Sequence, residues 1–177
     1  RFYEVRQAIK ATAMVTAKAV YESGGYSRHI LVGHSLGSVV AYDTLNALLN
    51  EDALSGQLHV APRTALLLTF GSPLDKTAFL FRAQSEFSDV REALASAAQP
   101  LISDPAARPP WINIYSDHDA ISGALDYYDP ERGIDRSPPH ARHGARPSRQ
   151  DAPAVVNIAD ADAWIPLVAH TQYWTNA

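Results

Sequence analysis

A serine flanked by two glycines is the feature of this sequence best suited to chemistry. Residues 33–37 are Gly-His-Ser-Leu-Gly, which matches the pattern G-x-S-x-G. The apolar run His29-Ile30-Leu31-Val32 precedes it and is typical of a strand buried on both faces. The segment 36–50 follows with the apolar spacing of a helix. A serine at a tight turn between strand and helix holds its hydroxyl above the sheet edge, so the pattern predicts that Ser35 is a nucleophile.

The turn also places requirements on the residues beside the serine. A Cβ at Gly33 or Gly37 would collide with the crowded crossing of strand and helix, so we expect both glycines to be required. The Leu36 N–H lies at the expected start of the helix, facing the oxygen that becomes negative in a tetrahedral intermediate. Leu36 is therefore the predicted oxyanion-hole donor.

The turn and the strand after it resemble those of a known family. The turn continues into Ser38-Val39-Val40-Ala41-Tyr42-Asp43, and a later apolar strand ends in Thr69-Phe70-Gly71-Ser72-Pro73. Both segments are similar to those of the α/β-hydrolase family, and of its lipases and esterases in particular. The similarity extends from about Phe2 to Trp174, with the serine turn as its only specific motif. The resemblance implies a Ser-His-Asp triad in an α/β fold, without a metal or a cofactor.

A serine nucleophile needs a histidine that takes its proton. In α/β-hydrolases the acid and then the histidine follow the serine in the chain, which excludes the histidines at positions 29, 34 and 59. His140 and His143 lie in an Arg- and Pro-rich segment with no strand to carry them to the sheet edge. His170 follows the last expected strand and precedes the aromatic segment 171–174, which can hold a loop against the core. We predict that His170 is the base; the alternative for this residue is a histidine that faces solvent.

Two carboxylates, Asp117 and Asp119, follow the expected strand 111–115. The acid must accept the ring N–H of His170 that faces away from the serine, which fixes the tautomer and stabilises the imidazolium. Family members often have a small and then an aliphatic residue after this acid, and Ala120-Ile121 after Asp119 matches that pattern. We therefore predict Asp119, with Asp117 as the alternative acid.

The elements that must position these residues alternate between strands and helices. Apolar patterns predict helices at 2–21, 36–50 and 79–98 and strands at 29–32, 65–70, 111–115 and 154–159. In the first helix the predicted inner stripe is Phe2, Val5, Ile9, Ala13, Ala17 and Val20. The order of elements predicts a single α/β domain over residues 1–177, with a mostly parallel sheet and helices on both faces. The carboxyl ends of such strands share one edge, where ligands bind.

Composition and charge exclude several other classes of function. The 177 residues are enough for one domain with a core, and 46% are hydrophobic and 19% charged, as in ordinary globular proteins. The net charge of −4 argues against a nucleic-acid binder. There are no cysteines, which excludes disulfides and thiolate metal sites but leaves the compartment open. No apolar run reaches 18 residues, so we expect no transmembrane segment.

The segment 126–151 is rich in arginine and proline and nearly free of aliphatic residues, which predicts a long surface loop inserted in the domain. Its arginines form the only basic patch of the sequence. A solvated loop explains them, and contact with an anionic headgroup or a partner surface is the alternative. Its histidines, together with His118 and nearby aspartates, fit no closed zinc pattern, so we expect no metal.

Only one helix is expected before the serine turn, whereas a complete α/β-hydrolase has several strands there. The second oxyanion donor of the family comes from a loop after an early strand, so this sequence offers no candidate for it. The strand before Ser35 would also be a bare apolar edge. We expect that upstream strands are missing from this stretch of sequence, the alternative being a reduced form of the fold.

These observations predict hydrolysis of a carboxylic ester, from a small molecule or a lipid, through an acyl-enzyme on Ser35. Peripheral contact with a membrane is compatible with this prediction. Two alternatives remain: an acyltransferase with the same triad, and a non-catalytic binding domain of the same fold. The missing upstream loop favours the binding domain, whereas the serine, acid and histidine in family order argue against it. The acyl chain, the head group and the oligomeric state are left open.

Overall fold

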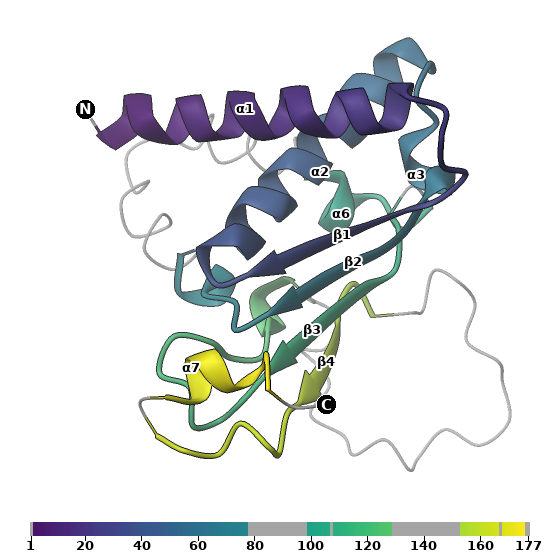
Figure 1. Ribbon diagram of the computed structural model, residues 1–177. Helices are drawn as coiled ribbons and strands as arrows, with labels where there is room; N and C mark the ends of the chain where they lie inside the picture. Colours follow the sequence, from purple (N-terminus) through teal and green to yellow (C-terminus); the bar gives the residue numbers. More distant parts are fainter. Residues whose placement is uncertain (1, 78–98, 107, 129–152, 167, 176–177) are drawn as a thin grey trace, which may run out of the picture.

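Four strands form one parallel sheet in this computed structural model, which describes residues 2–77, 99–106, 108–128, 153–166 and 168–175 (Figure 1). The strands are β1 (His29–His34), β2 (Thr64–Phe70), β3 (Trp111–Tyr115) and β4 (Val156–Ala159). They lie side by side in chain order, and every neighbouring pair is parallel. The predicted α/β class with a parallel sheet is confirmed, and the carboxyl ends of all four strands lie along one edge.

Of the two long helices, α2 (Leu36–Ser55) packs on one face of the sheet, and α1 (Phe2–Glu22) packs on α2. The helix predicted at 36–50 is confirmed, and its leucines Leu45, Leu48 and Leu49 are buried. The helix continues beyond the predicted end at residue 50, because the break comes only at Gly56, which adopts the left-handed conformation (φ 63°). The short helices are α3 (Val60–Arg63), α6 (Pro100–Ser103), the 3₁₀ turn η1 (Asp126–Tyr128) and α7 (Ala169–Gln172).

The predicted inner stripe of α1 is wrong over most of its length. Val5, Ile9 and Val20 are exposed, whereas Ala17 of the predicted stripe packs against the core, together with Met14 and the buried Tyr21, which lie outside the stripe. Among the described elements α1 packs mainly against α2, and an Ala-rich helix offers several stripes with the same spacing. Sequence periodicity alone does not select among them.

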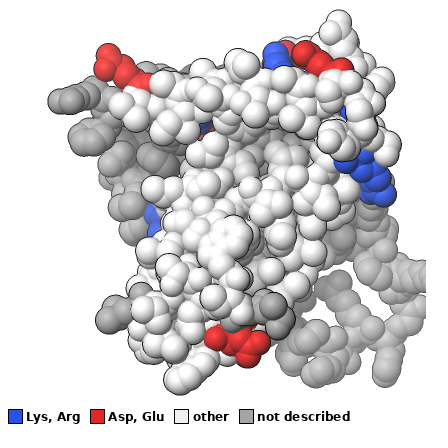
Figure 2. Space-filling view, in the orientation of Figure 1, with Lys and Arg blue, Asp and Glu red and all other residues white. Residues whose placement is uncertain are grey.

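The second face of the sheet carries aliphatic side chains that the described residues leave open to solvent. In-register partners place Val32, Leu68, Ile112 and Val156 in one row across the four strands, and Ile30 pairs with Leu66 on the same face. On the outer strands, Ile30, Val32, Val156 and Ile158 are 45–60% exposed. Figure 2 shows the middle of the view, where Figure 1 places the strands, in white, with charged residues at the margins.

We predicted helices on both faces of the sheet. Within the part of the chain that the structure describes, helices cover only one face. The helix predicted at 79–98 lies outside that part, and so does the Arg- and Pro-rich segment 126–151 apart from η1. None of the described helices combines the length and apolar character needed to cross a bilayer.

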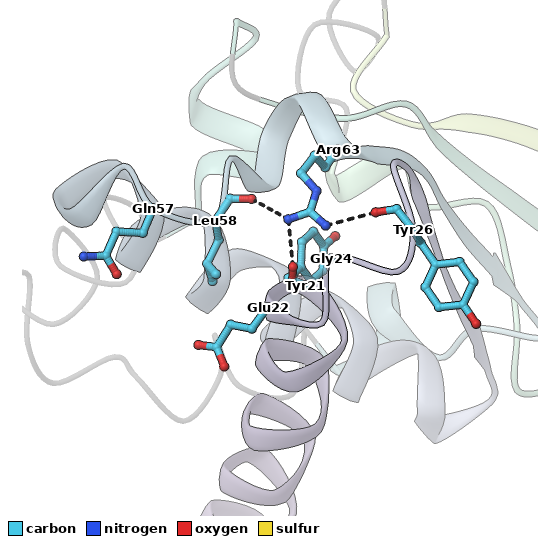
Figure 3. Close-up of a pocket in the computed structure, with 7 residues that line it drawn as sticks. All are labelled: Tyr21, Glu22, Gly24, Tyr26, Gln57, Leu58 and Arg63. Carbon is cyan, nitrogen blue, oxygen red and sulfur yellow. Dashed lines mark hydrogen bonds between the residues drawn. The ribbon is translucent and has the colours of Figure 1, made fainter.

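Arg63 ties the end of α1 to the start of the sheet. Its guanidinium donates to the carbonyls of Tyr21 (2.8 Å), Leu58 (3.1 Å) and Tyr26 (3.1 Å), in a pocket at the end of the helix (Figure 3). A fourth N–H lies 3.1 Å from Nε2 of the buried His29. Burial and the nearby Arg63 charge lower the pKa of His29, so this histidine accepts the bond in its neutral form. Because its donors are used in this way, Arg63 serves the fold, with little left to bind a ligand.

A buried chain of hydrogen bonds crosses the inner face of the sheet. The indole of Trp111 donates to the Thr69 hydroxyl (3.0 Å), which donates to the side-chain carbonyl of Asn113 (3.0 Å). The Asn113 amide donates to Asn157 (2.9 Å) and to the carbonyl of Gly123 (3.1 Å). Thr69 and Asn113 have no exposed surface. The chain of bonds thereby fixes the loop after β3 to the sheet.

Replacing Asn113 by Leu (Asn113→Leu) keeps the approximate volume but leaves the Thr69 hydroxyl and the Gly123 carbonyl without their partner. We expect the free energy of unfolding to fall by about 1 to 3 kcal/mol, measured by urea denaturation. The control Gln57→Leu, at an exposed position, should change it by less than about 0.5 kcal/mol. An Asn113→Leu protein as stable as wild type would contradict the role assigned to this bond chain.

Candidate active site

Ser35 lies at the turn between β1 and α2 in a backbone conformation that is unusual for a side chain (φ 54°, ψ −131°). Its N–H donates to the carbonyl of Phe70 at the end of β2 (3.1 Å), and its own carbonyl accepts from the Ser38 hydroxyl (2.6 Å). The Ser38 hydroxyl also lies 2.7 Å from that of Ser72, and both residues are buried. The strained turn is thus held from the next strand and from the first turn of α2.

The two glycines of the turn differ in what they do. A Cβ on Gly33 would lie 2.5 Å from Cα of Ser38 and 2.8 Å from the carbonyl oxygen of Gly37, which no side chain tolerates. A Cβ on Gly37 would meet nothing within 4 Å. The expectation that both glycines are required is therefore wrong for Gly37, whose missing side chain would have pointed away from the strand crossing.

Three side chains distant in sequence form one hydrogen-bonded chain. Nε2 of His170 lies 2.9 Å from Oγ of Ser35, and Nδ1 of His170 lies 2.8 Å from Oδ2 of Asp119. The Asp119 carboxylate is almost fully buried, whereas the His170 side chain remains 18% exposed. Ser35 lies directly after β1, Asp119 follows β3 and His170 lies in α7, so all three meet at the carboxyl edge of the sheet.

The Asp119 carboxylate is held in its charged form. Burial by itself would raise its pKa, but the hydrogen bonds that it accepts outweigh burial and lower the pKa to about 2. The donors besides His170 include the N–H of Ile121 (2.8 Å) and the hydroxyl of Tyr173 (3.0 Å). A carboxylate that stays charged can orient the His170 ring and stabilise its protonated form.

Tyr173 is a supporting residue that sequence reasoning did not assign. Its hydroxyl contacts Asp119 and lies 2.9 Å from the hydroxyl of Ser122. Burial raises the pKa of Tyr173 to about 12, and the Asp119 carboxylate acts in the same direction, so the phenol keeps its proton and donates it. The position of Tyr173, three residues after His170, indicated only that an aromatic segment could hold the loop.

The structure separates the other candidates from this cluster. Asp117 and His118 are exposed, and the carboxylate bonded to His170 is that of Asp119. His140 and His143 lie outside the described residues.

Sequence analysis also missed the contact between Ser38 and Ser72, because the sequence gives no sign that a hydroxyl in the helix and one after β2 will meet.

The Leu36 N–H is the first of α2 and takes no acceptor within the described residues. Such an N–H at a helix start is available to an oxygen that gains negative charge. The Leu36 side chain is 68% exposed. The cluster therefore combines groups that acyl transfer to a serine can use, namely a hydroxyl, an imidazole, a buried carboxylate and one N–H donor for an oxyanion.

Comparison with known proteins adds no relative. No family model, no curated protein and no solved structure matches the chain. A function must therefore be argued from the residues and their geometry.

The two glycines give a matched pair of substitutions. Gly33→Ala should destabilise the protein by several kcal/mol or prevent folding, because a Cβ at 2.5 Å from backbone forces the strand and helix apart. Gly37→Ala should be neutral or stabilising by up to about 1 kcal/mol, because alanine favours the helix. Thermal unfolding of both variants measures these changes. An equal loss of stability at the two positions would contradict the different roles assigned to Gly33 and Gly37.

Proposed function

We propose that the protein is a serine hydrolase of the α/β-hydrolase type that cleaves carboxylic esters, of small molecules or lipids, through an acyl-enzyme on Ser35. The observation that carries the proposal is the hydrogen-bonded chain from Ser35 through His170 to Asp119. Its geometry is what general-base activation of a hydroxyl requires, with heavy-atom distances between 2.6 and about 3.2 Å. The strained backbone of Ser35 is a second, independent support.

In the first step, Nε2 of His170 takes the hydroxyl proton as Ser35 Oγ attacks the ester carbonyl carbon. The carbonyl oxygen becomes negative and accepts a hydrogen bond from the Leu36 N–H. The protonated His170 is stabilised by the Asp119 carboxylate. It then gives its proton to the leaving alcohol oxygen as the C–O bond breaks, which leaves the acyl group on Ser35.

In the second step, His170 takes a proton from water, whose oxygen attacks the acyl carbon. The second tetrahedral intermediate collapses, the bond to Ser35 Oγ breaks, and His170 returns the proton to that oxygen. No redox change occurs: the Ser35 proton leaves on the alcohol, and a proton from water replaces it, both through His170. An alcohol in place of water would make the same chemistry an acyl transfer.

Exposed apolar side chains beside the three residues support an apolar acyl group. Leu36 adjoins Ser35, Ile121 lies two residues after Asp119, and Val168 lies two residues before His170. Their exposed fractions are 68%, 43% and 46%, and Trp174 beyond α7 is 67% exposed. Each would lose water on contact with a hydrocarbon chain, which favours binding of such a substrate.

The serine is tested by labelling with a fluorophosphonate, which reacts with activated serines. Wild-type protein should be labelled and should turn over a short p-nitrophenyl ester. Ser35→Ala should lose both activities, because the nucleophilic oxygen is gone, whereas the control Ser23→Ala, at an exposed serine after α1, should keep them. Full labelling of the Ser35→Ala protein would overturn the proposal.

The acid is tested by the matched pair Asp119→Asn and Asp117→Asn. Asp119→Asn should lower kcat by about 10⁴-fold, since an amide cannot stabilise protonated His170 or fix its tautomer. Asp117→Asn should stay within about threefold of wild type, because an exposed side chain without a bond to His170 contributes little. Steady-state rates with the p-nitrophenyl ester measure both, and the reverse ranking would assign the acid to Asp117.

A further inference from the structure

His34 links the serine turn to the segment that carries His170. It is the second residue of the turn motif, and its chain position excludes it as the base. Its Nε2 nevertheless lies 3.1 Å from the backbone carbonyl oxygen of His170. The two imidazole rings are 5.0 Å apart between centroids, with 30° between their planes. One histidine thus lies against the backbone and the ring of the other.

The hydrogen bond sets the tautomer of His34. A carbonyl oxygen only accepts, so Nε2 of His34 must carry the proton and donate it. This bond fixes the main chain at His170, while Asp119 fixes the far side of its ring. Two points on opposite sides of the residue therefore determine where Nε2 of His170 lies relative to Ser35.

The surroundings of His34 are shaped for this contact. Its ring stacks on Phe70 at 4.9 Å, and Trp174 packs edge-on against it at 5.4 Å. Gly71 has a positive φ of 57°, and a Cβ there would lie 3.1 Å from Nε2 of His34 and 3.2 Å from Cε1 of His170. A glycine at position 71 therefore leaves the space in which the two imidazoles meet.

The segment around His170 needs such an attachment. The helix α7 has only four residues, too few to be stable without tertiary contacts, and Trp164, Ile165 and Val168 before it are exposed. A displacement of about 1 Å in a reacting group can lower a rate by about 100-fold. Contacts that hold the main chain of this segment in place should therefore affect the rate of proton transfer.

We propose that His34 is a positioning residue, whose Nε2–H bond to the His170 carbonyl holds α7 against the serine turn and keeps the base within reach of Ser35. As a statement about rates, the proposal rests on the hydrolase function above. As a statement about attachment of the segment, it stands on the contacts alone. Both parts are open to measurement.

Two substitutions separate the hydrogen bond from the stacking. His34→Phe keeps an aromatic ring against Phe70 and Trp174 but has no donor. His34→Gln places an amide N–H near the position of Nε2 and removes the ring. Thermal unfolding of both variants checks that they fold. The control is His59→Gln, at an exposed histidine before α3.

The first readout is hydrogen exchange of the amides in residues 168–175, which requires no activity. Some of these amides bond within the segment, among them Thr171 N–H to the Val168 carbonyl at 2.9 Å. Exchange should be at least about fivefold faster in His34→Phe and return toward wild type in His34→Gln. Unchanged protection in His34→Phe would overturn the attachment.

The second readout is kinetic. In His34→Phe, kcat and the rate of fluorophosphonate labelling should fall by about 10- to 100-fold with KM changed less than about threefold, because the base is displaced while the substrate surface remains. His34→Gln should recover most of this loss. Equal defects in both variants would overturn the proposal, since the shared change is loss of the imidazole ring.

A wild-type protein that is never labelled would overturn the hydrolase function and the effect on rates. The hydrogen-exchange data would then decide by themselves whether His34 attaches the segment.

Discussion

The close approach of β1 and α2 is the constraint on which the site depends. The chain must reverse from strand to helix within a few residues, and the Ser38 backbone then passes where a Cβ of residue 33 would lie. Only glycine at that position allows the crossing. The geometry forces Ser35 to a positive φ and projects it beyond the end of the strand, so strain in one residue and exposure of its hydroxyl have the same origin.

Polar contacts then bring the other two groups to this turn. The Asn113 bonds hold the loop after β3, and the Asp119 N–H donates to the Ser116 carbonyl at 3.1 Å, which curves the chain so that the carboxylate faces inward. Tyr173 and His170 reach the same carboxylate from the last described residues. A buried carboxylate with several donors is rigid, and it therefore joins the loop after β3 to the segment that carries His170 and Tyr173.

Local patterns were enough to predict the strands and the serine turn. The short apolar runs 65–70 and 111–115 are typical of buried strands, and the structure has strands at both. The same reasoning failed for α1, where Val5 and Ile9 have the spacing of a buried stripe but lie in solvent. It also failed for Gly37, because the direction of a missing Cβ is a property of the folded turn and not of the motif.

In the site, too, sequence patterns predicted some residues and missed others. Motif, chain order and the family pattern selected Ser35, Asp119 and His170, and His170 lies within hydrogen-bonding distance of both of the others. Ser38 with Ser72, Tyr173 and the His34 contact could not be found in this way. Each depends on two segments that meet only after folding, and serine, tyrosine and histidine occur at many positions where they do nothing of this kind.

The open face of the sheet has a consequence for how the protein behaves at high concentration. Ile30 and Val32 on β1, and Val156 and Ile158 on β4, present aliphatic surface, and these two strands are the outer strands of the sheet. Any neighbour that displaces water from them lowers the free energy, so molecules of this chain should adhere to one another. Sulfate, which is excluded from protein surfaces, should promote this self-association, and low concentrations of urea should reverse it. Self-association is thus governed by side chains on the open face of the sheet.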